Sequence, residues 1–272
     1  MICCVSWEIL ADNEGKIQCR HRLFASTFFY VGRTQVNIET LKVKIFADGA
    51  SLSEIVNLSQ RTYIKGFTTN PTLMRQANVS DYVEFAHDVL DHIKDRPISF
   101  EVFSDEFDEM ERQARLIASW ADNVYVKIPV TNTQGKPSYE LISRLAQSGV
   151  KVNVTAVFTL AQVKKVTQAL LHGPSSVVSV FAGRVADAGV DPAVHMHKAL
   201  EIVRECPSAE LLWASPRELW NIVQADQVGC HIITVTSNLL SKLSLLGKDL
   251  EEFSLDTVKM FYDDAQKAQY KL

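Results

Sequence analysis

Strand-like and helix-like patterns alternate from residue 41 to the C-terminus, and this alternation constrains the fold more than any other feature. Short runs of β-formers, such as Ile98–Val102, precede stretches with apolar residues at helical spacing, such as Glu106–Trp120. About eight strand–helix units can be counted, the number that a closed (β/α)8 barrel needs. A doubly wound sheet also alternates, but it usually carries a glycine-rich phosphate loop after its first strand, and Asp48-Gly49-Ala50 is not such a loop.

We therefore expect an α/β protein built as a single (β/α)8 TIM barrel over residues 42–272. The expected strands are 42–48, 62–67, 98–102, 124–128, 150–155, 176–181, 211–214 and 230–234. The expected helices are 51–59, 82–93, 106–120, 138–147, 160–171, 193–204, 216–224 and 237–245. An extra C-terminal helix over 255–270 either caps the barrel or packs on a neighbouring subunit.

Residues 1–41 form an N-terminal extension outside this pattern. Val5–Leu10 and Ile17–Phe24 are strand-like on either side of a turn. Cys3, Cys4, Cys19 and His21 match no standard zinc spacing, so we expect no metal site there. We favour a disordered extension, or residues upstream of the native start.

Composition narrows the class of protein. The chain has 272 residues, a formal net charge of -4 and no basic stripe, which argues against nucleic-acid binding. No apolar run is long enough to span a membrane, and the start of the chain lacks the basic leader of a signal peptide. Cys206 and Cys230 lie in apolar contexts typical of buried free thiols in a reducing compartment. We expect a globular enzyme of the cytoplasm.

Lys127 is the first candidate catalytic residue. It lies near the end of an apolar run of β-formers, Val124-Tyr125-Val126-Lys127-Ile128, and Pro129 stops the strand. Burying an unpaired ammonium is costly, and the cost falls when the amine loses its proton. A neutral amine beside an apolar pocket is a nucleophile for carbonyl carbon, which suggests a Schiff-base lysine. A strand-end lysine that reaches out to water is the alternative.

Polar residues of one parity favour the catalytic interpretation. Residues two apart face the same side of a strand, and in a (β/α)8 barrel catalytic groups lie at the C-terminal strand ends. The residues with inward parity at the ends of successive strands are Asp48, Thr68, Asn70, Glu101, Lys127, Asn153, Thr155, Ser179, Phe181 and Ser215. Polar groups converging at one mouth need partners there, which a binding site provides. Taken alone, Asn70 before Pro71 is also explained as a helix cap, and Asp48 before Gly49 as a turn residue. Lys44, low in the first strand, is expected near the barrel floor or its rim, in a structural role.

Two arginines suggest a phosphate site near the last strands. Arg184 follows the sixth strand in Phe181-Ala182-Gly183-Arg184, and Ser215-Pro216-Arg217 follows the seventh and opens a helix. Guanidinium groups offer a planar donor fork for phosphate, and a helix start adds backbone N–H groups. A surface ion pair explains either arginine alone, but both at one rim favour a phosphate clamp.

These motifs together resemble the transaldolase family, which includes the fructose-6-phosphate aldolases. The resemblance rests on Asp48, Gly66-Phe67-Thr68-Thr69-Asn70-Pro71, Glu101, Val126-Lys127-Ile128-Pro129, Asn153-Val154-Thr155 and Phe181-Ala182-Gly183-Arg184. It runs from about Val43 to the C-terminus and does not cover the first forty or so residues. It implies a Schiff-base enzyme without metal or other cofactor, and sugar phosphates as substrates.

The resemblance also implies a role for each site residue. The catalytic set is Lys127 as the imine lysine, Glu101 as an acid/base acting through a water held with Thr155, and Asp48 as the base at the C4 hydroxyl. The substrate-binding set is Thr68, Asn70, Asn153, Ser179, Phe181, Arg184, Ser215 and Arg217.

Two residues favour a transaldolase over the aldolase branch. Glu101 stands where the resembling aldolases have glutamine, and Phe181 stands where they tend to have tyrosine. The loop at Ser215–Arg217 departs from the family pattern, which leaves the acceptor open. Short members of the family form rings through the C-terminal helix, so we expect a homo-oligomer. The alternatives are fructose-6-phosphate aldolase cleavage, a non-catalytic sugar-phosphate-binding barrel, or a deoxyribose-phosphate-type aldolase with Lys65 as a second lysine.

Overall fold

The computed structural model describes residues 6–11, 17–22 and 38–271, and it divides the chain into units 1–34 and 35–272. In the first unit, β1 (Ser6–Ala11) pairs antiparallel with β2 (Ile17–Arg22), and Ser6 lies opposite Arg22. The pair corresponds to the two strand-like runs in the sequence. The metal site considered for Cys3, Cys4, Cys19 and His21 lies outside the residues whose side chains the structure describes.

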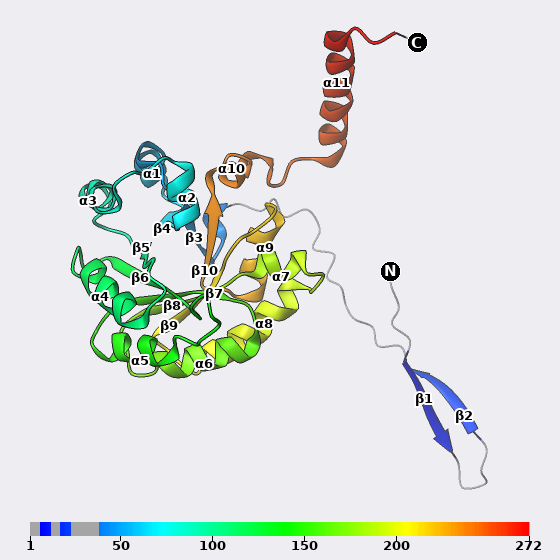
Figure 1. Cartoon of the computed structure of the whole chain (residues 1–272). Helices are drawn as coiled ribbons and strands as arrows, with labels where there is room; N and C mark the ends of the chain where they lie inside the picture. The colour runs from blue at the N-terminus through cyan, green and yellow to red at the C-terminus, as the bar shows by residue number, and fades with distance from the viewer. Residues whose placement is uncertain (1–5, 12–16, 23–37, 272) are drawn as a thin grey trace. The chain divides into compact units, whose positions relative to one another are not determined.

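The second unit is a closed barrel of parallel strands in the order β10-β3-β4-β5-β6-β7-β8-β9 (Figure 1). The strands are β3 (Lys44–Asp48), β4 (Ile64–Thr68), β5 (Ile98–Glu101), β6 (Val124–Pro129), β7 (Val152–Val157), β8 (Ser176–Val180), β9 (Ala209–Trp213) and β10 (Ile232–Thr236). Each overlaps one of the strands predicted from sequence, so the (β/α)8 fold is confirmed.

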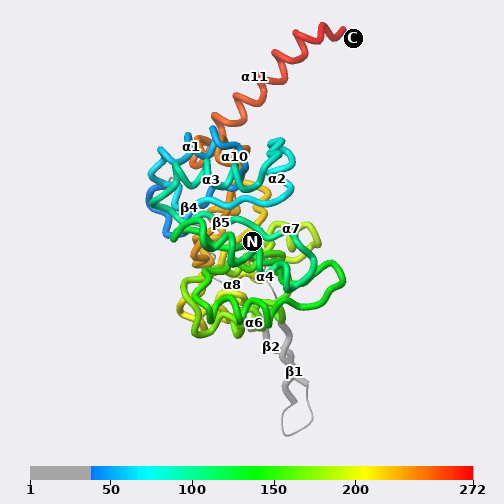
Figure 2. The backbone as a smooth tube through the Cα atoms, turned by 60° about the vertical axis from the view of Figure 1, so that its left-hand side comes forward, coloured from blue at the N-terminus to red at the C-terminus, as the bar shows by residue number. Residues whose placement is uncertain are grey.

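Helices follow the strands around the outside of the barrel (Figures 1 and 2). They are α1 (Leu52–Ser59), α2 (Pro71–Gln76), α3 (Tyr82–His92), α4 (Phe107–Ala118), α5 (Tyr139–Gln147), α6 (Leu160–Leu170), α7 (Ala182–Asp187), α8 (Pro192–Val203), α9 (Trp220–Val228), α10 (Ser237–Leu240) and α11 (Leu250–Ala268), with 3-10 turns η1 (Ile38–Thr40) and η2 (Leu243–Leu245). The short helix α7 was not predicted, and α2 was anticipated only through the helix-cap explanation for Asn70. The prediction that a helix opens at Pro216 was wrong, because α9 begins at Trp220.

Two apolar layers hold the barrel together. Side chains of one parity fill its interior, namely Phe46, Val177, Leu212, Ala214 and Ile232. Those of the other parity form the larger core between strands and helices. Gly66 shows how tightly the interior packs, because a Cβ atom there would lie 2.5 Å from Cζ of Phe46. Glycine at this position of β4 therefore leaves room for the Phe46 ring.

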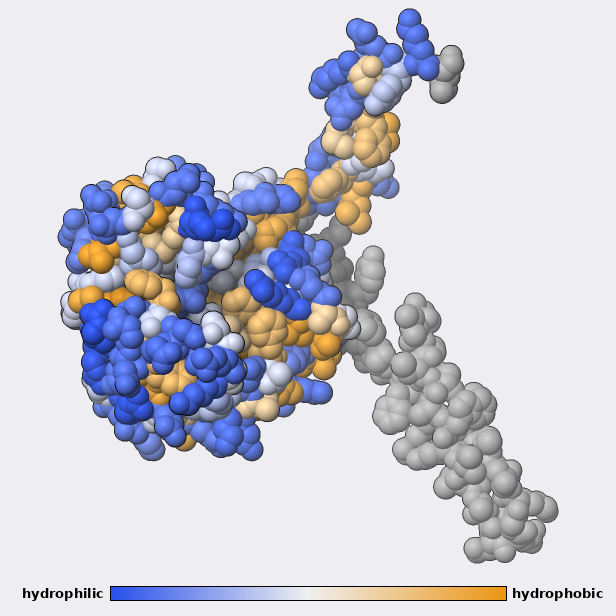
Figure 3. All heavy atoms as spheres, viewed as in Figure 1, coloured by the Kyte–Doolittle hydropathy of each residue, from blue (hydrophilic) through white to orange (hydrophobic). Residues whose placement is uncertain are grey.

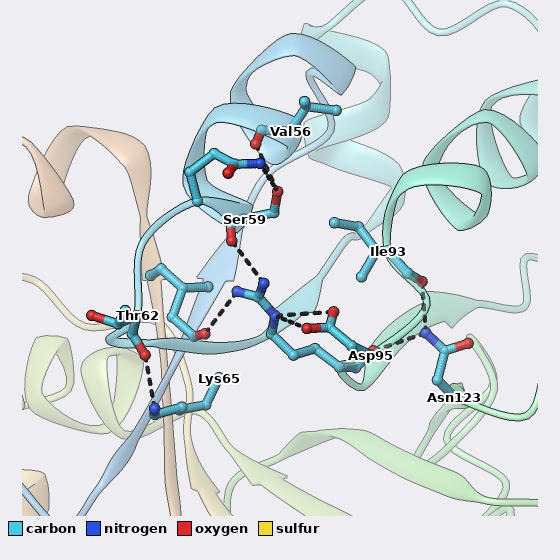
Figure 4. Close-up of polar contacts among 10 residues, drawn as sticks. Val56, Ser59, Thr62, Lys65, Ile93, Asp95 and Asn123 are labelled. Carbon is cyan, nitrogen blue, oxygen red and sulfur yellow. Dashed lines mark hydrogen bonds and ion pairs between the residues drawn. The ribbon is translucent and has the colours of Figure 1, made fainter.

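Polar contacts tie the strand starts together at the barrel floor. The Lys44 ammonium lies 2.6 Å from both carboxylate oxygens of Glu210, which confirms the structural role predicted for this lysine. The Arg96 guanidinium donates to the carbonyls of Ser59 (2.7 Å) and Ile64 (3.1 Å), in the network of Figure 4. These bonds fix the lower ends of β4 and β5.

The helix α11 stands off the barrel in both views, and none of its residues is buried (Figures 1 and 2). Hydrophobic side chains are exposed along it, including Val258 (60% exposed) and Phe261 (64%) (Figure 3). The helix begins five residues earlier than the predicted Leu255, because Asp249 caps it through the N–H groups of Glu251 and Glu252. Among the described residues, no helix is long and apolar enough to cross a membrane.

Candidate active site

A cavity of about 670 Å³ opens at the C-terminal ends of the barrel strands. Every residue predicted for the site lines it: Asp48, Thr68, Asn70, Glu101, Lys127, Asn153, Thr155, Ser179, Phe181, Arg184, Ser215 and Arg217. They come from seven strands or the loops after them. Ser215 follows Ala214, which has the interior parity of β9, so the inward parity given to Ser215 was wrong, and the loop after β9 brings this residue to the cavity. Their individual roles stay predictions.

The cavity wall also includes residues that sequence reasoning missed. Thr234 and Thr236 of β10, with Asn238 and Lys242 after it, complete the wall. The signal was present, because Thr234 and Thr236 share the parity of the interior residue Ile232. The predicted set of strand-end residues included none from the eighth strand.

Lys127 is held inside the cavity by two oxygen atoms. Its side chain is 9% exposed, and Nζ donates to the Thr69 carbonyl at 2.8 Å. The same nitrogen lies 3.3 Å from Oε2 of Glu101, on the neighbouring strand. The register of β5 and β6 places Glu101 opposite Lys127, which explains this contact. The lysine does not reach out to water, so the alternative explanation from sequence is wrong.

Asp48 faces Lys127 from the end of β3. Its Oδ1 accepts a hydrogen bond from Thr68 Oγ1 at 2.8 Å, and the Thr68 hydroxyl also contacts the Thr234 hydroxyl. Burial raises the pKa of Asp48, and this effect outweighs the charge of Lys127 and the Thr68 hydrogen bond, which lower it. A carboxylate with a raised pKa is suited to accept a proton.

A chain of hydrogen bonds orients Asn153. Its amide donates to Ser99 Oγ at 3.0 Å, and its Oδ1 accepts from the Ser179 hydroxyl at 2.6 Å. Asn70, in contrast, uses its Oδ1 to cap α2 through the Leu73 N–H. The capping explanation for Asn70 therefore holds, and the residue still lines the cavity.

A β-bulge follows Thr155. Pairing of β7 with β8 shifts between Val154 and Val157, and Ala156 adopts φ 56°. Left-handed backbone is unfavourable for alanine, and such strain is concentrated at functional sites. Thr155 itself is buried on the cavity wall, 3% exposed. No sequence signal marks this bulge, because alanine does not favour positive φ.

The two arginines predicted to bind phosphate, Arg184 and Arg217, differ from each other in their contacts. Arg184 lies in α7, and its guanidinium is 5.6 Å from the ring centre of Phe181. Arg217 forms a two-pronged ion pair with Asp187. The ion-pair alternative thus applies to Arg217, and no helix N-terminus stands at Pro216.

Gly183 is required for a reason other than a turn. A Cβ atom at this position would lie 1.5 Å from the Ser215 carbonyl oxygen. Its small size therefore lets the start of α7 meet the loop after β9. Ser215 itself adopts φ 60°. The residues predicted to bind phosphate, Arg184, Ser215 and Arg217, are neighbours because α7 touches this loop.

Lys65 does not serve as the second lysine that the deoxyribose-phosphate-type alternative needs at the barrel mouth. Its ammonium is exposed and donates to the Thr62 carbonyl at 2.7 Å (Figure 4). Lys65 is not among the residues that line the cavity. Lys242 is the further lysine on the cavity wall. Among the residues whose side chains are described, no group of three or more His, Cys, Asp or Glu is arranged to hold a metal ion.

Comparisons with known proteins agree with this geometry. The family described as Transaldolase/Fructose-6-phosphate aldolase matches residues 45–272. A "Probable transaldolase 2" of Listeria monocytogenes is 33% identical over 218 residues, which are 79% of this chain and 95% of that protein. A "Probable transaldolase" of Dehalococcoides mccartyi is 34% identical over 204 residues, covering 74% and 90%. The tryptophan synthase alpha subunit of Campylobacter jejuni superposes with a TM-score of 0.50 at 10% identity over 74% of this chain and 90% of that one, a likeness of fold alone.

Proposed function

This chain belongs to the transaldolase and fructose-6-phosphate aldolase family, and we propose that it is a transaldolase working through a Schiff base on Lys127. The observation that carries the proposal is the position of this lysine. It is buried at the cavity wall, 3.3 Å from the Glu101 carboxylate, and Asp48 lines the same cavity. These are the groups that imine formation and carbon–carbon cleavage require.

The first step is attack of neutral Lys127 on the ketone carbon of a ketose phosphate. Loss of water then gives an iminium ion, which is an electron sink. Proton transfer is needed at each stage, and Glu101 supplies it through a water held with Thr155. The 3.3 Å between Lys127 Nζ and Glu101 Oε2 supports this role.

The second step is cleavage of the C3–C4 bond. Asp48 takes the proton of the C4 hydroxyl, and the bonding electrons flow into the iminium to form a three-carbon enamine. An aldose phosphate leaves, and a second aldose phosphate adds to the enamine in the reverse sequence. Sedoheptulose 7-phosphate or fructose 6-phosphate is the donor, and glyceraldehyde 3-phosphate or erythrose 4-phosphate is the acceptor, as in the pentose phosphate pathway.

The remaining cavity residues bind substrate. Asn70, Asn153 and Ser179 hold the hydroxyls of the dihydroxyacetone unit, and the hydrogen bonds that orient Asn153 support this. Thr68 positions Asp48. The phosphate group is held by Arg184, Ser215 and Arg217, whereas Phe181 forms an apolar wall.

Transfer is favoured over simple aldol cleavage because Glu101 can ionise. A carboxylate beside the imine nitrogen moves protons in both directions, which a glutamine cannot do. Fructose-6-phosphate aldolase activity is the second candidate, since the family includes both activities. We further propose a cytoplasmic homo-oligomer, supported by the buried free thiols of Cys206 and Cys230 and by the exposed apolar residues of α11.

A paired substitution tests the proposed function. Lys127→Met removes the nucleophile while keeping an apolar stem, so we expect a folded protein without turnover of fructose 6-phosphate and erythrose 4-phosphate. Lys65→Met is the matched control, because Lys65 is exposed and does not line the cavity. Retention of full activity by the Lys127→Met protein would refute the assignment.

A further inference from the structure

The hydrogen-bond ladder between β4 and β5 stops one rung below Glu101. Phe67 lies opposite Ile98, and Thr68 lies opposite Ser99. The Thr69 N–H donates to the Ser99 carbonyl at 3.1 Å, which continues the parallel pattern. In a parallel ladder the next bond would run from the Glu101 N–H to the Thr69 carbonyl. Both groups of this expected rung have other partners.

Beside Glu101, the Tyr82 hydroxyl replaces the hydrogen-bonding groups that β4 would otherwise supply. Its oxygen accepts the Glu101 N–H at 2.9 Å and donates to the Glu101 carbonyl at 2.7 Å. One side chain therefore satisfies both backbone groups of Glu101 that face β4. Burial raises the pKa of Tyr82 well above its ordinary value, so the phenol keeps the proton that it donates.

The freed Thr69 carbonyl serves Lys127. This oxygen accepts the hydrogen bond from Lys127 Nζ at 2.8 Å. The missing hydrogen bond would join the Glu101 N–H to the Thr69 carbonyl. Glu101 and Lys127, which now binds that carbonyl, are the two residues proposed for imine chemistry. A buried carbonyl and a buried N–H both need partners, so a change at one half alters the other.

The phenol is placed rigidly. Tyr82 begins α3, and Asp81 caps this helix through the N–H groups of Val83 and Glu84. The Tyr82 ring packs against Phe103 with centroids 5.4 Å apart and against Trp120 at 6.1 Å. These contacts belong to the ring, so the hydroxyl can be removed without taking away the packing.

We infer that Tyr82 is a positioning residue that holds the Glu101 backbone and leaves the Thr69 carbonyl free for Lys127. The inference rests on the proposed Schiff-base function of the site. Without the hydroxyl, the Thr69 carbonyl is the acceptor that a continued parallel ladder offers to the Glu101 N–H. The rung then closes, Glu101 moves toward β4, and Lys127 loses its carbonyl partner.

Kinetics of Tyr82→Phe test the consequence for activity. A displacement of reacting groups by about 1 Å costs on the order of 100-fold, so we expect kcat to fall about 10- to 100-fold. KM for the aldose phosphate should stay within about twofold, because the substitution leaves Arg184, Ser215 and Arg217, the proposed phosphate-binding residues, unchanged. Tyr125→Phe is the matched control, a half-buried tyrosine whose hydroxyl bonds Ser175. Equal kcat values for Tyr82→Phe and wild type would overturn the inference.

A crystal structure of Tyr82→Phe tests the geometry without any turnover. We expect Glu101 N within hydrogen-bond distance of Thr69 O, and Lys127 Nζ displaced from that oxygen. An unchanged Lys127–Thr69 contact would overturn the inference even if the enzyme is a transaldolase. Conversely, a wild-type protein without Schiff-base chemistry would refute the proposed function while the geometric test still stands. If Tyr82→Phe does not fold, Asp81→Ala, which loosens the start of α3, should lower kcat, and an unchanged kcat would contradict the inference.

Discussion

At the scale of single residues, the cavity places two carboxylates and a lysine in different surroundings. Asp48 is held by Thr68 and lies in surroundings that raise its pKa. Glu101 lies beside Lys127 and has its backbone held by Tyr82. This difference in surroundings supports the different tasks proposed for the two carboxylates.

Asp48→Asn should stabilise the fold while abolishing cleavage. Folding raises the pKa of Asp48, so its stability contribution is present below the unfolded carboxyl's pKa and is lost as pH rises through the folded value. Asparagine removes the unfavourable buried charge and can still accept from Thr68. A gain on the order of 1 kcal/mol raises Tm by about 2–4 °C in a chain of this size.

Calorimetry at two pH values checks this prediction. The Tm difference between Asp48→Asn and wild type should be positive at pH 7.5 and should shrink as the pH falls toward the ordinary carboxyl range. Asp91→Asn is the control, because Asp91 is exposed on α3. A lower Tm for Asp48→Asn at pH 7.5 would contradict the described burial of its charge.

Glu101→Gln should separate transfer from cleavage. The amide keeps the shape of the side chain but does not ionise, so proton exchange during imine formation and breakdown slows. We expect the rate of transfer to erythrose 4-phosphate to fall more than the slow release of dihydroxyacetone. Coupled assays of both products measure the ratio, and equal losses in the two reactions would count against the role given to Glu101.

Strand parity predicted the inward residues because alternation is a local property of the chain. Asn153 and Thr155 could be paired on sight, since they are two apart in one strand. The contacts of Tyr82 with Glu101 and of Arg217 with Asp187 could not be predicted. They join residues 19 and 30 positions apart, and they depend on how helices lie against the barrel.

At the scale of elements, the eight strands were predictable because each is a buried apolar run. The apolar spacing did not predict α2 and α7, because each has six residues, too few to show a helical repeat. The start of α9 was misplaced at Pro216 although proline favours a first helical turn. Ser215 adopts φ 60°, and Asn221 accepts the N–H groups of Arg217 and Glu218 with its side chain, so the helix begins later.

Gly183→Ala should displace residues proposed to bind phosphate, namely Ser215 and Arg217. The new Cβ would lie 1.5 Å from the Ser215 carbonyl, so the loop after β9 must move and carry Arg217 with it. Loss of one charge-assisted contact costs about 1.5–3 kcal/mol, which corresponds to a rise in KM of about 10- to 100-fold.

Steady-state kinetics with erythrose 4-phosphate and with unphosphorylated glyceraldehyde measure this effect. The KM increase should be confined to the phosphorylated acceptor. Gly49→Ala is the control, because a Cβ there meets no atom within 4 Å. The same KM increase for both acceptors would show that the loop does not act through phosphate.

At the scale of the whole molecule, the helix α11 does not pack on the barrel. None of its residues is buried, and Val258, Phe261 and Tyr262 are each at least 60% exposed. Exposed apolar side chains of this kind mark interaction surfaces. The spacing of apolar residues predicts this helix, but no local pattern predicts what packs against it.

Val258→Ser combined with Phe261→Ser should dissociate the proposed homo-oligomer. The two substitutions remove apolar surface from α11 and leave the barrel unchanged. Light scattering coupled to size exclusion should show a smaller mass than wild type, whereas Asp263→Ser on the same helix should not change the mass. An oligomer of unchanged mass in the double variant would contradict assembly through α11.

The Schiff base on Lys127 is tested most directly by borohydride trapping. The wild-type protein is incubated with fructose 6-phosphate, reduced, digested and mapped by mass spectrometry. We predict a three-carbon adduct on Lys127, which requires both imine formation and cleavage of the C3–C4 bond. Absence of an adduct with any ketose phosphate would contradict the proposed function and would favour a barrel that binds sugar phosphates without reaction.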